Sequence, residues 1–156
     1  MAAAGEVSAA RLATHRPYEG VSLSRAGRVL ALRMIRRHRL IELFLLKTLD
    51  MSWDEVHDEA EQLEHAVSAD FEQKLQEKLG TQVICPHGNR VGLDRPRDRR
   101  ERGWLPLNEA TGAVQVASVF ERDRQLLEYL DGLGIRPGAR LQMLARNYDD
   151  TVTLKV

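Results

Sequence analysis

Residues 24–49 read SRAGRVLALRMIRRHRLIELFLLKTL and set the architecture, because they form one long helical pattern that no proline interrupts. Ser24 stands where its hydroxyl can accept a backbone N–H that the first turn of a helix leaves free. From Leu40 to Leu49 the pattern is apolar on nearly all sides. Such a helix must be covered on more than one side, by other helices or by another subunit.

Two shorter helices are predicted to follow it. The sequence Ser52-Trp-Asp-Glu55 is a capping box and predicts a helix over residues 53–67. Ser68 caps the next helix, over residues 69–79, which a glycine closes. Three helices in succession predict a mainly α domain.

The last third of the chain changes character. Valines near residues 114–119 and the stretches 141–145 and 152–156 predict short strands, with one helix over residues 122–130. We expect a small β-barrel with one helix that rests on the helical part for stability. The expected organisation is an amino-terminal tail and turn, a helical domain, a charged linker and the small barrel: residues 1–23, 24–90, 91–103 and 104–156.

Composition excludes several classes of protein. Of the 156 residues, 43% are hydrophobic and 29% are charged, as in ordinary globular proteins, and the net charge is zero. No apolar stretch is long enough to span a bilayer, and the amino terminus lacks the pattern of a secretion signal, so we expect a cytoplasmic protein without membrane contact. The single Cys85 cannot form an internal disulfide, and we interpret it as structural.

The neutral total hides a basic segment. Six arginines and no acid occur between Arg25 and Arg39. Such a run is either a solvated helix face or a surface that faces phosphates. Arg16, Arg25 and Arg28 are the candidates for weak, sequence-independent DNA phosphate contacts.

Four metal-binding side chains share one face of the second predicted helix. His57, Glu61, Glu64 and His65 are spaced i, i+4, i+7 and i+8, which places them on an arc of about 100°. On the preceding helix, His38 and Glu42 form a further i, i+4 pair. If the two helices pack antiparallel, these side chains can close one or two coordination spheres.

The donor types indicate which ion is bound. Imidazole and carboxylate without thiolate suit Mn²⁺ or Fe²⁺, with Zn²⁺ and Co²⁺ as surrogates. A zinc protease is not indicated, because Glu61 stands where a His-Glu-x-x-His motif requires its second histidine. Since nothing in the sequence pairs a nucleophile with a base, we do not expect an enzyme.

Three segments in order resemble the diphtheria-toxin-repressor family of metal-dependent transcription regulators, which includes the manganese-transport regulators. They are Arg36-Arg-His-Arg-Leu-Ile-Glu42, Trp53-Asp-Glu-Val-His57 through His65, and Pro86-His-Gly. Residues 105–156 resemble the optional SH3-like domain of that family, which is similar to ferrous-iron-transport protein A. The resemblance implies a homodimeric repressor of metal-homeostasis genes that binds double-stranded DNA when metal is bound.

The resemblance also implies roles for individual residues. Glu61, Glu64 and His65 match ligands of the primary, activating site. His38, Glu42 and His57 match the ancillary site, and His38 also joins the metal cluster in manganese-type members. Glu61 is a manganese-type feature, whereas the ancillary set and the SH3-like domain are iron-type features, so metal selectivity stays open. Glu121 is a candidate ligand from the SH3-like domain, with Asp123 as its competitor.

The chain departs from the family pattern at its amino-terminal end. Residues 15–24 resemble the wing of a winged helix-turn-helix, and the residues before them are too few for the three helices of that domain. A misplaced gene start, a truncated chain and a natural short form would each explain this. The alternative function is therefore a truncated metal-binding dimerisation protein without specific DNA binding of its own.

Overall fold

The computed structural model describes residues 12–16, 18, 20–80, 84–89, 96–149 and 151–156. A two-stranded hairpin opens the described part, with β1 (Ala13–Arg16) antiparallel to β2 (Gly20–Leu23). The strand expected around residues 21–23 is therefore present. Residues 1–11 of the expected amino-terminal tail, and Pro17 of the expected turn, lie outside the described residues.

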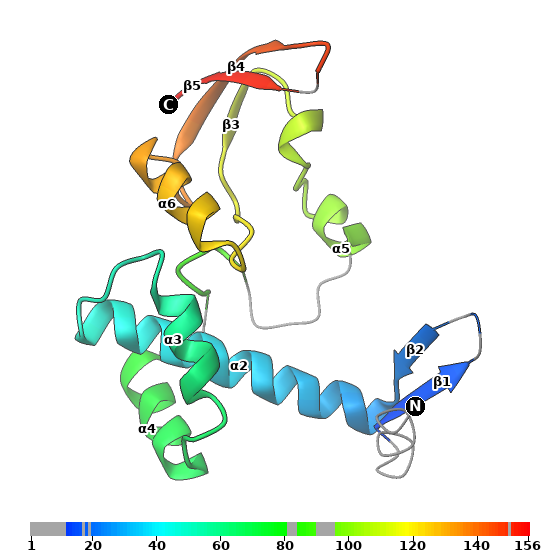
Figure 1. Cartoon of the computed structure of the whole chain (residues 1–156), viewed down its shortest axis with the longest axis vertical. Coiled ribbons are helices and arrows are strands. Elements are labelled where there is room, and N and C mark those ends of the chain that lie inside the picture. Colours follow the sequence, from blue (N-terminus) through cyan, green and yellow to red (C-terminus); the bar gives the residue numbers. More distant parts are fainter. Residues whose placement is uncertain (1–11, 17, 19, 81–83, 90–95, 150) are drawn as a thin grey trace.

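The helix α2 (Arg25–Thr48) is the axis of the helical part, and its start agrees with the predicted cap. The hydroxyl of Ser24 accepts the backbone N–H of Gly27 at 3.0 Å. Figure 1 shows the hairpin at the amino-terminal end of α2, while α3 and α4 pack near its carboxy-terminal end. The core lies at that second end, where Leu40, Ile41 and Val56 are fully or almost fully buried.

The helix α3 (Val56–Leu63) begins later than the capping box predicts. The side chains of Ser52 and Glu55 bond to each other at 2.6 Å and do not cap backbone N–H groups. Trp53, predicted to be helical, lies in a turn before α3 and is buried, with its indole N–H donating to the carbonyl of Pro86. Tertiary packing of the tryptophan has replaced the first turn of the helix.

The helix α4 (Ala69–Leu79) has the predicted ends. The hydroxyl of Ser68 accepts the N–H of Phe71, and Gly80 follows with a φ of 88°. The short helix α5 (Pro96–Glu101) was not predicted, because that segment was expected to be a linker. Residues 91–95 of the expected linker lie outside the described residues.

The carboxy-terminal part is a three-stranded antiparallel sheet with one helix, preceded by the 3-10 turn η1 (Leu107–Glu109). Its strand order is β3 (Ala113–Gln115), β4 (Arg140–Arg146) and β5 (Val152–Lys155). Among the described residues the sheet does not close, so "barrel" overstates the architecture, while the order of a helical domain followed by a small antiparallel sheet is confirmed. The helix α6 (Arg124–Gly132) begins two residues later than predicted, because Asp123 caps it.

No helix among the described residues combines the length and the apolar character that a membrane crossing requires.

Candidate metal centre

Two groups of side chains that could hold a metal ion meet at Glu42. One consists of His38, Glu42 and His57, and the other of Glu42, Cys85, His87 and Glu121. Within each group the donor atoms all lie within 4.8 Å of one another. Donors on opposite sides of one first-row metal ion are about 4–4.6 Å apart, since each bond is about 2.0–2.3 Å long. Each group therefore has dimensions that suit one ion.

The first group is built by two helices packed against each other. The α2 helix places His38 and Glu42 one turn apart, and α3 contributes His57 from its first turn. Oxygen Oε1 of Glu42 lies 3.2 Å from Nε2 of His38 and 3.1 Å from Nδ1 of His57, and these two nitrogens are 2.9 Å apart. Three donor atoms thus converge on one point.

His38 links this group to Glu64. Its Nδ1 lies 2.9 Å from Oε2 of Glu64, so the ring stands between two carboxylates. Burial opposes the charged ring, but the hydrogen bonds and charges of Glu42 and Glu64 outweigh it and raise the pKa of His38 above its ordinary value. The two contacts of the His38 ring tie Glu64 to the first group.

The second group joins the helical part to the carboxy-terminal part. Cys85 and His87 lie in a tight turn after α4, and Glu121 lies just before α6. The carboxylate of Glu121 accepts from the Cys85 thiol at 3.5 Å and from Nδ2 of Asn89 at 2.5 Å. Donors from three separate segments therefore meet around Glu42.

A close backbone approach holds that turn in place. Gly88 has a φ of 84°, and a Cβ atom there would lie 2.1 Å from the carbonyl oxygen of Ala117. The backbone N–H of Val119 donates to the carbonyl of His87 at 3.0 Å. Only glycine fits this position, because any side chain would push the 117–119 segment away.

Two acceptor atoms in the second group are buried without a hydrogen-bond partner among the described residues: Oε2 of Glu42 and Nδ1 of His87. Nε2 of His87 must carry the ring proton, because its neighbour at 3.0 Å is the carbonyl oxygen of Trp53, which can only accept. Nδ1 of the neutral ring is then a lone pair 3.5 Å from Oε1 of the same Glu42 carboxylate. A cation between them would satisfy both, so the residues fit a metal ion.

Negative charge exceeds positive charge around the second group. Burial, together with the charges of Glu42 and Glu121, raises the pKa of the Cys85 thiol far above its ordinary value. The Arg39 guanidinium is 90% buried and lies 3.9 Å from Glu121, which offsets part of the negative charge. A metal ion would displace the thiol proton, because the thiolate is the form that binds metals.

The structure separates the predicted donors into two sets. His38, Glu42 and His57 come together, Glu64 joins them through His38, and Glu121 lies in the second group. Glu61 and His65 are exposed, and neither belongs to a group of three donors within the described part of the chain. The imidazole of His65, 73% exposed, contacts Glu64 at 3.3 Å. Because α3 ends at Leu63, Glu64 is its C-cap residue, with the backbone N–H still bonded to the carbonyl of Ala60, and His65 follows the helix.

Asp123, the competitor of Glu121, has another role. Its Oδ1 accepts the backbone N–H of Leu126 at 3.0 Å and caps α6. Glu121 is the carboxylate that reaches the second group.

Cys85 and His87 are the residues that sequence reasoning missed as donors. Cys85 was interpreted as structural, and His87 was quoted only as part of a motif. A usable signal was present, because Cys85-Pro-His87 places a thiol and an imidazole two residues apart in a turn. Their partners Glu42 and Glu121 are far away in the sequence, which hid the grouping.

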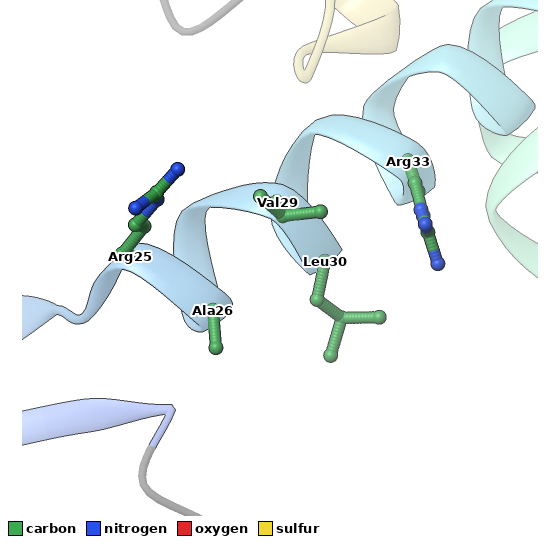
Figure 2. Close-up of a pocket in the computed structure, with 5 residues that line it drawn as sticks. All are labelled: Arg25, Ala26, Val29, Leu30 and Arg33. Carbon is green, nitrogen blue, oxygen red and sulfur yellow. The ribbon is translucent and has the colours of Figure 1, made fainter.

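The arginines proposed for phosphate contacts lie at the other end of α2. Arg16 ends β1, and Arg25 and Arg28 lie on the exposed first turns of α2. An open surface hollow in this region is lined by two arginines and three apolar residues, shown in Figure 2: Arg25, Ala26, Val29, Leu30 and Arg33.

Known protein families match both parts of the chain. Residues 24–91 match the iron dependent repressor, metal binding and dimerisation domain, and residues 106–156 match the FeoA domain. The chain is 31% identical over 137 residues to the iron-dependent repressor IdeR of Mycobacterium tuberculosis, covering 78% of this chain and 58% of that protein. It is 37% identical over 149 residues to the diphtheria toxin repressor of Corynebacterium jeikeium, covering 80% of this chain and 62% of that one.

Solved structures with the same fold include manganese regulators. A manganese-dependent transcriptional repressor in complex with manganese has a TM-score of 0.82 at 33% identity, covering 98% of this chain and 71% of that one. The manganese regulator SloR has a TM-score of 0.78 at 29% identity, covering 97% and 71%. The chain thus spans between half and two thirds of the length of the curated repressors, and somewhat more of the structures.

Proposed function

Because the chain belongs to the iron-dependent repressor family, to which the diphtheria toxin repressors also belong, we propose that it is the metal-sensing and dimerising part of a metal-dependent transcriptional repressor. It acts as a homodimeric, cytoplasmic regulator of metal-homeostasis genes and is not an enzyme. The observation that carries the proposal is the buried Glu42 carboxylate, which has imidazoles from α2, α3 and the 84–89 turn around it.

The proposed ions are Mn²⁺ or Fe²⁺, with Zn²⁺ and Co²⁺ as surrogates. Imidazole and carboxylate donors in the first group favour the harder ions, whereas Cys85 in the second group favours softer ones. The relatives include proteins named for each of the two metals. The mycobacterial protein is an iron-dependent repressor, and one structural relative is a complex with manganese. Other relatives have been solved with bound Cd²⁺ and Zn²⁺.

The proposed ligands follow the geometry and the family. His38, Glu42 and His57 bind one ion, and Glu121 binds with Cys85 and His87. Glu61, Glu64 and His65 are proposed for the activating site, for which Glu64 is held in position by His38. The exposure of Glu61 and His65 leaves their lone pairs open to an ion that further ligands complete.

Residues 24–90 and 104–156 are proposed to be two domains joined by residues 91–103.

The dimer is proposed to form through α2 and its neighbours. Apolar side chains remain exposed along α2 and directly after it, with Val29 and Leu30 at 46% and Leu49 at 55%. Burial of such residues against a second copy would be favourable. Sedimentation of a monomer at micromolar concentration, with and without Mn²⁺, would contradict the dimer.

Binding to double-stranded DNA is proposed for the whole protein. Arg16, Arg25 and Arg28 supply phosphate contacts that position the protein without reading the sequence. Metal would act by a population shift, binding more tightly to the arrangement that is competent for DNA.

The test combines calorimetry with a DNA-binding assay on the same chain. Titration with Mn²⁺ and Fe²⁺ is expected to give saturable binding that weakens in Glu64→Ala and in His65→Ala. Retardation of DNA that requires both metal and a specific sequence at physiological salt supports the repressor function. Metal binding without such retardation supports the alternative, a metal-binding dimerisation protein, and no metal binding at all contradicts both.

A further inference from the structure

The two oxygens of Glu42 have different surroundings. Oε1 lies 3.2 Å from Nε2 of His38, 3.1 Å from Nδ1 of His57 and 3.5 Å from Nδ1 of His87. Oε2 is equally buried, and within the described residues it lacks a partner. A buried carboxylate oxygen without a hydrogen bond is costly, so a second cation at Oε2 would remove a free-energy penalty.

The second group supplies what such a cation needs. His87, which is fully buried, has its free Nδ1 lone pair near Glu42. Cys85 and Glu121 add a thiol and a carboxylate within the same 4.8 Å set. Together with Glu42 these residues make four donors, a number that closes a tetrahedral sphere.

One ion cannot use all six donor side chains as they are arranged. The two groups overlap only at Glu42, which means that the six donor atoms do not fall within one 4.8 Å set. The rings of His57 and His87, one from each group, have centroids 6.2 Å apart. Two overlapping groups suit two neighbouring ions, since paired metal ions lie about 3.5–4 Å apart.

We propose that Glu42 bridges two divalent ions, one held with His38 and His57 and the other with Cys85, His87 and Glu121. The inference rests on the proposed metal binding and adds that the two positions are not independent. The first takes a hard ion such as Mn²⁺, and the second takes a softer ion such as Zn²⁺ or Co²⁺ through the Cys85 thiolate. The thiol proton leaves to solvent when that bond forms.

Charges of the surrounding residues support two ions. When both positions are filled, the carboxylates of Glu42, Glu64 and Glu121 and the Cys85 thiolate contribute four negative charges. Two divalent ions contribute four positive charges, and the Arg39 guanidinium near Glu121 adds one more. The buried excess is one unit, which is small for a centre of this size. His38, His57 and His87 count as neutral in this sum, because imidazole binds metal in its neutral form.

Co²⁺ is the probe, because it accepts all of these donors and a thiolate bond to it produces a charge-transfer absorption in the near ultraviolet. The chain is equilibrated with Co²⁺, and bound metal per chain is measured after dialysis. Relative to the unchanged chain, His57→Gln and Cys85→Ser are each expected to lose about one ion, and Glu42→Gln to lose both or to bind them at least about tenfold more weakly. Glu128→Gln, an exposed change on α6, is the matched control and retains every ion.

Low-temperature electron paramagnetic resonance tests the bridge itself. Two Co²⁺ ions that share a carboxylate are magnetically coupled, so the signal per cobalt in the unchanged chain should be weaker than in His57→Gln or Cys85→Ser. The charge-transfer band should persist in His57→Gln and vanish in Cys85→Ser. If Glu42→Gln fails to fold, the two other variants still decide, because each leaves one ion of the pair without its neighbour.

Two ions with no coupling, and a Glu42→Gln variant that loses only one of them, would overturn the bridge and leave the proposed metal binding intact. A chain that binds one ion, with or without the thiolate band, would also overturn it. Failure to bind Co²⁺, Mn²⁺ or Fe²⁺ at all would overturn the proposed function as well.

Discussion

Glu42 and Glu61 are both helical glutamates with a histidine four residues before them, yet the structure treats them in opposite ways. Glu42 is fully buried, and its carboxylate faces three imidazoles. Glu61 is exposed on α3. The comparison teaches that helical spacing finds candidate donors but does not distinguish a buried carboxylate from an exposed one. The difference matters because a buried carboxylate oxygen without a partner cannot turn to water, whereas the carboxylate of Glu61 can.

The largest effect is expected from the turn that brings Cys85 and His87 to the buried side. Gly88→Ala places a methyl group against the backbone of Ala117 at a positive φ, and it should lower the free energy of unfolding by about 3 kcal/mol. Gly80→Ala is the control, because its φ of 88° is similar but no atom lies within 4 Å of the added group. Its cost should be about 1 kcal/mol, from the backbone alone. Equal losses in chemical denaturation would contradict the close approach.

A smaller effect separates the two glutamates directly. In the metal-free protein, Glu42→Gln removes the charge that three histidines surround and should lower stability by about 2 kcal/mol. Glu61→Gln should change stability by less than about 0.5 kcal/mol, since it alters an exposed side chain. Thermal denaturation in the presence of a chelator measures both. The comparison fails if Glu61→Gln costs as much as Glu42→Gln.

The smallest effect is a pH dependence. His38 has a raised pKa in the folded protein, so its contribution is complete below the ordinary value of 6.5 and is lost as pH rises through the folded value. For Glu42, burial raises the pKa, but the hydrogen bonds of His38 and His57 and the charge of His38 outweigh it and lower the pKa, so its contribution holds above 4.5 and is lost in acid. The metal-free protein should therefore be most stable between about pH 4.5 and 6.5 with respect to these groups.

His38→Gln should flatten the decline above pH 6.5, whereas His65→Gln, which removes an exposed imidazole, should leave it in place. Denaturant midpoints measured across this range would show the difference. An unchanged slope in His38→Gln would mean that another group carries the dependence.

Residue type and spacing along the chain correctly predicted the features of the fold that neighbouring residues determine, namely the helix caps and the strands. The caps at Ser24 and Ser68 and the strands of the sheet follow from residue types and spacing. The start of α3 was predicted wrongly, because burial of Trp53 against the 84–89 turn outweighs an N-terminal capping box. The same limit applies to the metal centre. His38, Glu42 and His57 are grouped by helical spacing, but Cys85 and His87 reach Glu42 only through the docking of a distant segment.

The length of α2 gives its two ends different mechanical roles. About 17 residues separate Arg25 from Glu42, a span of about 26 Å along a continuous helix. A tilt of about 5° about the Glu42 end would displace the hairpin end by about 2 Å. A small tilt of α2 at Glu42 is therefore amplified along the helix. The β1–β2 hairpin at the amino-terminal end (Figure 1) would move by a distance comparable with the length of a hydrogen bond.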